Sequence, residues 1–223
     1  MSSQQKQFKF YAGSPLSMHL TTMLYTSFWR CVEKPDAHMQ FCSKDNYFAM
    51  EALYSFVLSI NIWEAILNET FQNDFIMQQN NIFSDASEAI NKWDIKTKTI
   101  TFPKLLLNKT FDKGNVLWQD FNAIVGIRNE IIHFKSSLFE GPKKQVDYLR
   151  AKNLTVQLNN CATPWQTEVS TTECMRFCIN TTVKMIHTFV KLFVDAGVDS
   201  MPFMPFKELY REISIDDVRI KKA

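Results

Sequence analysis

Large apolar side chains recur every three or four residues in four long stretches of the chain, which is the pattern of amphipathic helices. The clearest stretch predicts a helix over residues 46–71. Its main stripe consists of Leu53, Phe56, Val57, Ile60, Trp63, Leu67 and Phe71. Because Tyr54, Ile62 and Ile66 lie off this stripe, we expect a central helix that contacts neighbours on two sides.

The first predicted helix has recognisable ends. Ser14 suits an N-cap, Pro15 suits the first helical turn, and Pro35 stops the helix. Its expected buried stripe is Leu16, Leu20, Leu24, Phe28 and Cys31.

The third and fourth helices follow the same spacing. The third is predicted over 115–138, before Gly141-Pro142 breaks it. The fourth begins where Ser170 and Glu173 stand in capping-box register, and Gly197 suits its C-terminal end.

The segments between these helices are more polar. We expect a polar insertion at 72–114, in which the alternating residues Lys96 to Phe102 predict a short strand. A second irregular segment is expected at 140–170. Because the chain contains no internal repeat, the simplest organisation is one domain over 1–223.

The composition favours an all-α fold. The 223 residues include only 5 Gly and 7 Pro, too few for the tight turns of a many-stranded sandwich or barrel. The net charge of +2 is uninformative by itself, but a dedicated nucleic-acid coat is usually far more basic, so we expect any RNA contact to be local.

The sequence also predicts a cytoplasmic protein without a metal or cofactor. Its N-terminus lacks the apolar core of a signal peptide, and no apolar run approaches the about 20 residues of a membrane span. Its five cysteines are scattered, as expected of reduced thiols. Cys174 and Cys178 are expected to fill the core, since no suitable metal-ligand partners accompany them.

Arg128, Asn129 and His133 form the one constellation that could support chemistry. Asn129 and His133 are four residues apart on the third helix and therefore share a face. Arg128 projects about 140° from His133 around the helix axis. Its long side chain either curls toward His133 or meets the motif of a second subunit.

These residue types are suited to metal-free RNA cleavage. A histidine can take the proton of a ribose 2′-hydroxyl or protonate the leaving 5′-oxygen. An arginine can hold the phosphate and offset the charge of the transition state. An asparagine can orient the histidine or bind a phosphate oxygen. The ordinary alternative is a helix-surface cation beside a hydrogen-bonded, half-buried histidine.

The run from Ile127 to His133 resembles the Arg-x4-6-His signature of the HEPN superfamily, with Asn129 directly after Arg128. The helix at 46–71 also resembles the first core helix of HEPN domains. This resemblance implies an antiparallel bundle of about four to six helices with irregular insertions. It also implies a homodimer whose two motif helices face each other across one RNA-binding cleft.

Many HEPN members are metal-independent endoribonucleases of toxin–antitoxin and antiviral-defence systems. The resemblance therefore assigns catalysis to Arg128, Asn129 and His133, with an antitoxin or another regulatory protein as a further partner. HEPN toxins paired with a nucleotidyltransferase antitoxin commonly carry His-x-Tyr, whereas Phe134 and Lys135 follow His133 here. A tyrosine-modification switch is therefore not expected at this place.

Three further side chains are candidate RNA contacts. Lys135 could bind a phosphate, or it is simply a solvated lysine at a helix end. Glu130 could tune His133, and Glu64 either approaches the cleft or forms a salt bridge.

Two function hypotheses follow, together with the possibility of an unrelated helical protein that carries the motif by chance. The first is a metal-independent endoribonuclease that acts as a homodimer. The second is a non-catalytic HEPN-like module that binds nucleotide, RNA or a protein partner.

Overall fold

The computed structural model describes residues 16–33, 48–71, 89, 92–133, 141–157, 163–197 and 210–220. This part of the chain is all-helical, which confirms the predicted fold class, and its only β contact is an isolated bridge between Phe48 and Thr171. The helices of the described residues are α1 (Leu16–Glu33), α2 (Ala52–Phe71), α5 (Ile95–Leu107), α6 (Val116–Ile132), α7 (Lys143–Ala151), α8 (Trp165–Val169), α9 (Thr172–Val194) and α10 (Ile215–Ile220).

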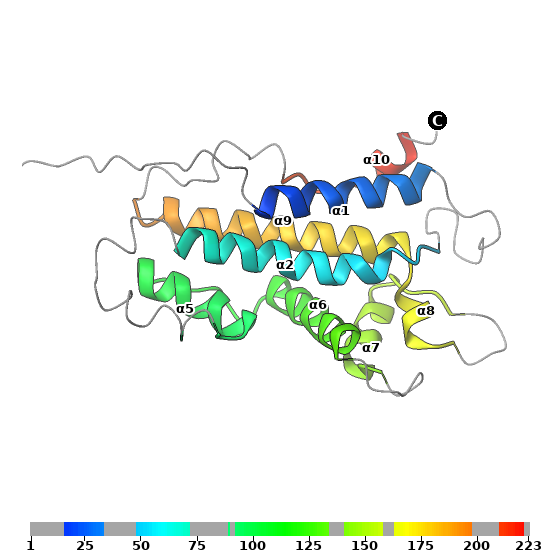
Figure 1. Ribbon diagram of the computed structural model, residues 1–223, viewed down its shortest axis with the longest axis horizontal. Coiled ribbons are helices and arrows are strands. Elements are labelled where there is room, and N and C mark those ends of the chain that lie inside the picture. Colours follow the sequence, from blue (N-terminus) through cyan, green and yellow to red (C-terminus); the bar gives the residue numbers. More distant parts are fainter. Residues whose placement is uncertain are drawn as a thin grey trace, which may run out of the picture.

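Helices α2 and α9 form the centre of the bundle (Figure 1). Helices α1 and α10 lie on one side of this pair, and α5, α6, α7 and α8 lie on the other. Ser17, at the start of α1, donates from its backbone N–H and its hydroxyl to Glu69 near the end of α2, so α1 and α2 are antiparallel.

Helices α2 and α9, in contrast, run parallel to each other. The Phe48–Thr171 bridge and the hydrogen bond from Ala49 N to Ser170 O, 2.9 Å long, hold the starts of both helices together. No short hairpin joins these two helices, because α5 to α8 lie between them in the chain. Their relative direction is therefore set by packing and not by a turn.

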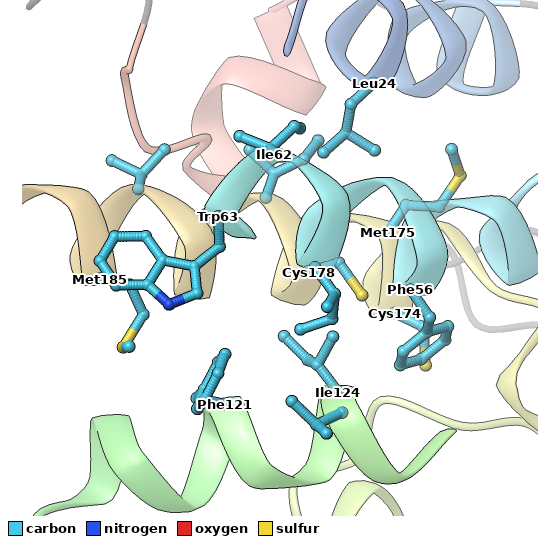
Figure 2. Packing of buried hydrophobic residues seen from close by; sticks show 14 of the residues in the cluster. Leu24, Phe56, Ile62, Trp63, Phe121, Ile124, Cys174, Met175, Cys178 and Met185 are labelled. Carbon is cyan, nitrogen blue, oxygen red and sulfur yellow. The ribbon is translucent and has the colours of Figure 1, made fainter. Parts of the chain in front are cut away.

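Helix α2 is buried on two sides, as its sequence pattern predicts. Ile62 packs on the side of Leu24 from α1, whereas Phe121 and Ile124 of α6 lie on the opposite side (Figure 2). The indole of Trp63 packs edge-on against Phe111 and Phe189, and its Nε1 donates to Thr99 Oγ1 at 2.8 Å. Trp63 thereby connects α2 to α5 and α9.

The predicted strand at Lys96 to Phe102 is wrong, because this segment belongs to α5. Asp94 caps the helix by accepting hydrogen bonds from the backbone N–H groups of Lys96 and Thr97. The core-facing residues Ile95, Thr99 and Phe102 follow the spacing of a helix. The alternating polarity of the segment is therefore misleading.

Other helix boundaries also differ from those expected. Thr171 caps α9 by accepting from Cys174 N, while Ser170 instead donates to Gln166 O, so the predicted capping box is wrong. The segment at 140–170, expected to be irregular, contains α7 and α8 within its described residues. Ser14, Pro15 and Pro35 lie outside the described residues.

Helix α9 has the length and apolar composition of a membrane-spanning helix. It nevertheless lies in the middle of the bundle, where Cys178, Ile186 and Phe189 belong to the hydrophobic core. The same composition is typical of the central helix of a helical bundle, and packing accounts for it here.

Candidate functional site

Helix α6 carries the Arg-Asn-x-x-x-His motif over its last turns. Asn115 caps its start by accepting from Trp118 N at 2.8 Å. Phe121, Ile124 and Ile127 bury its inner side against the bundle. The helix ends at Ile132, and His133 is its C-cap residue, with its backbone N–H donating to Asn129 O at 2.9 Å.

The side chain of Arg128 is held at the inner side of α6. It follows Phe121 by seven residues and Ile124 by four, and so it projects from the same side of the helix. Its Nη1 donates to Asn129 Oδ1 at 3.1 Å, whereas its Nε is buried without a hydrogen-bond partner among the described residues. Asn129 therefore fixes one end of a partly buried guanidinium group.

Asn129 and His133 are exposed, one turn apart on the same face of α6. The His133 imidazole makes no hydrogen bond or ion pair within the described part of the chain. The structure thus brings Arg128 and Asn129 together and leaves His133 open to an incoming group. Because Arg128 and His133 remain about 140° apart on one helix, a single protomer does not aim both at one point.

The three candidate RNA contacts have different positions. Glu130 is partly exposed beside the motif, and Lys135 lies outside the described residues. Glu64, on α2, accepts from Lys98 Nζ of α5 at 2.6 Å. These contacts support the second of the two expected roles of Glu64, a salt bridge, and not an approach to the cleft.

A second feature on α6 has no counterpart among the sequence-based predictions. A cavity of about 580 Å³ lies between α5, α6 and α7. The described residues that line it are Lys96, Gln119, Asn122, Ala123, Lys144, Gln145 and Tyr148. Lys96 and Lys144 come from helices that the sequence pattern did not predict, so no spacing rule could have connected them.

The described cysteines are structural. Cys31, Cys174 and Cys178 are buried free thiols. Burial raises the pKa of Cys178 well above its ordinary value and raises that of Cys31 to about 12, with Glu51 adding to the latter effect. Within the described residues, no group of three or more His, Cys, Asp or Glu side chains is arranged to hold a metal ion.

Comparison with known proteins gives no match among family models, curated proteins or solved structures. The geometry of α6 and its neighbours, together with the motif itself, is therefore the basis for assigning a function.

Proposed function

We propose that this protein is a metal-independent endoribonuclease of the HEPN kind, which cleaves RNA through Arg128, Asn129 and His133 and acts as a homodimer in the cytoplasm. The observation that carries the proposal is the end of α6, where the guanidinium of Arg128 donates to Asn129 and the exposed imidazole of His133 follows Asn129 one turn later on the same face. An RNA phosphate is the ligand for which an arginine and an amide are suited.

The proposed reaction is an attack of the ribose 2′-oxygen on the adjacent phosphorus. The 2′-hydroxyl gives its proton to a base, the new bond from the 2′-oxygen to phosphorus forms, and the bond to the 5′-oxygen breaks. The leaving 5′-oxygen takes a proton from an acid, so the products are a 2′,3′-cyclic phosphate and a 5′-hydroxyl. His133 serves as base or acid, and Arg128 offsets the charge that builds on the phosphate oxygens.

Dimerisation would resolve the angular separation of Arg128 and His133. In a two-fold symmetric dimer, Arg128 of one protomer can face the partner's His133, which produces two equivalent composite sites. Ile132, 46% exposed beside His133, offers an apolar contact for such an interface. The resemblance further implies a toxin or antiviral-defence effector, which an antitoxin or another regulatory protein would control.

Mixing two inactive variants tests the composite site. Arg128→Ala and His133→Ala should each be inactive, whereas a mixed dimer of the two retains one intact pair of Arg128 and His133. Random mixing should therefore restore about a quarter of the parental cleavage rate. No recovery in mixtures shown to contain mixed dimers would contradict a site shared between protomers.

The alternative, a non-catalytic binding module, is favoured by the cavity beside α6. A folded parent that leaves RNA intact in EDTA, also with candidate activators, would support this alternative.

His187→Ala is a matched control for His133→Ala in the cleavage assay, because His187 is likewise exposed on a helix but lies on α9, away from the motif.

A further inference from the structure

We propose that the cavity between α5, α6 and α7 binds a small organic phosphate, separately from any RNA at the motif. Its volume of about 580 Å³ falls within the about 300–1,000 Å³ that is common for small-molecule sites. The three helices that form its walls lie on the same side of the central α2–α9 pair (Figure 1).

The ionisable lining favours an anion. Among the described residues, Lys96 and Lys144 are the charged side chains that line the cavity, and no described carboxylate lines it. Neither lysine side chain forms a hydrogen bond or an ion pair within the described residues. Two lysines on different helices suit the double charge of a phosphate monoester better than the single charge of a carboxylate.

Two carboxylates that neighbour lining residues, Asp94 and Asp120, have partners of their own. Asp94, which caps α5, accepts from the Thr97 hydroxyl and two backbone N–H groups. These bonds, that of the hydroxyl first, lower its pKa against the opposing effect of burial. Asp120 of α6 accepts from the Tyr148 hydroxyl at 2.7 Å and from Lys152 Nζ at 2.9 Å. Asp94 also attracts Lys96, which helps to lower the pKa of Asp94 and offsets part of the Lys96 charge, whereas Lys152 balances the charge of Asp120.

Tyr148 supplies a fixed wall for the organic part of the ligand. Its hydroxyl is bound to Asp120, and Lys152 Nζ lies 5.2 Å from the centre of its ring. Burial and the neighbouring Asp120 raise the pKa of Tyr148, so the phenol stays neutral and adds no negative charge. The apolar Ala123 lines the cavity as well.

Three amides complete the lining and can bind phosphate oxygens or ligand hydroxyls. Gln119 and Asn122 come from α6, and Gln145 comes from α7. Gln145 lies across Gly126, where an added Cβ would be 2.5 Å from Gln145 Cγ. The glycine therefore allows the Gln145 amide to lie directly on α6, at the edge of the cavity.

Calorimetric titration of the full chain tests the proposal. The probes are pyrophosphate, a sugar phosphate, a nucleoside 5′-diphosphate, acetate and a short single-stranded RNA. We expect saturable binding of at least one of the small phosphates and none of acetate. Failure of every small phosphate to bind would overturn the proposal, and so would binding of RNA that no small phosphate displaces.

Charge-neutralising variants place the ligand in the cavity. Lys96→Gln and Lys144→Gln should each weaken binding roughly tenfold, because each removes one charge-assisted contact. Lys143→Gln is the matched control, since Lys143 is the exposed neighbour of Lys144 but does not line the cavity, and it should retain the parental affinity. Equal affinities for all three variants would refute the assignment. His133→Ala should bind as the parent does, which separates this test from that of the nuclease.

Discussion

Replacing Glu64 with glutamine should destabilise the fold, because the change leaves Lys98 charged and without its partner in the interior. The side chain of Lys98 is 1% exposed, and its Nζ lies 2.6 Å from Glu64 Oε1. Removing one partner of a buried ion pair costs about 3–5 kcal/mol. Because the Glu64 side chain is 32% exposed, water reaches the pair from one side, and we expect a loss of about 2–3 kcal/mol.

Urea unfolding followed by circular dichroism measures this loss directly. In a thermal scan, the same loss corresponds to a fall in Tm of about 4–12 °C for a chain of this size. Glu212→Gln is the matched control, because the Lys184–Glu212 pair is exposed at both ends, and it should cost less than about 0.5 kcal/mol.

A double variant separates the ion pair from other effects of the substitution. Lys98→Met together with Glu64→Gln should be more stable than Glu64→Gln alone, because the unpaired charge is gone. A loss below about 0.5 kcal/mol for Glu64→Gln would refute the argument. If Glu64→Gln abolished RNA cleavage while unfolding like the parent, Glu64 would belong to the site instead.

Two further predictions concern α9 and the buried thiols. Thr171→Ala should cost about 1–2 kcal/mol in urea unfolding, because Thr171 Oγ1 accepts from Cys174 N and donates to Leu154 O, whereas the exposed Thr22→Ala should be nearly neutral. Coinciding unfolding curves for Thr171→Ala and the parent would contradict this. Cys31 and Cys178 should resist iodoacetamide at pH 8 in the folded protein and react in urea, because burial raises both thiol pKa values, that of Cys31 to about 12. Peptide mass spectrometry measures the labelling, and rapid modification of either thiol in the folded protein would refute the prediction.

The long helices could be predicted because packing on both sides of α2 leaves a dense apolar pattern in the sequence. The stripe through Phe56, Ile60 and Trp63 is buried as expected. In α1 the pattern is less reliable, since Leu16 is 61% exposed while the polar Ser17 and Thr21 are buried. Both of these polar side chains form hydrogen bonds, which makes their burial tolerable.

The shorter helices and the cavity could not be found in the same way. In α5, alternating polar and apolar residues suggested a strand, although the Asp94 cap two residues before Lys96 was a usable signal for a helix. The cavity joins Lys96 of α5 to Lys144 of α7, and only tertiary packing brings these residues together. For the motif, the sequence predicts its helix and the shared face of Asn129 and His133, but not the bond from Arg128 to Asn129.

The most direct test of the proposed function is an analysis of RNA fragment ends after incubation of the purified protein with mixed RNA in EDTA. We predict 2′,3′-cyclic phosphate ends from the parent and from His187→Ala, and intact RNA from His133→Ala and Arg128→Ala, all four being folded. DNA should remain intact, because it lacks the 2′-hydroxyl. Undiminished cleavage by His133→Ala, or intact RNA with the folded parent and candidate activators, would contradict the proposed nuclease.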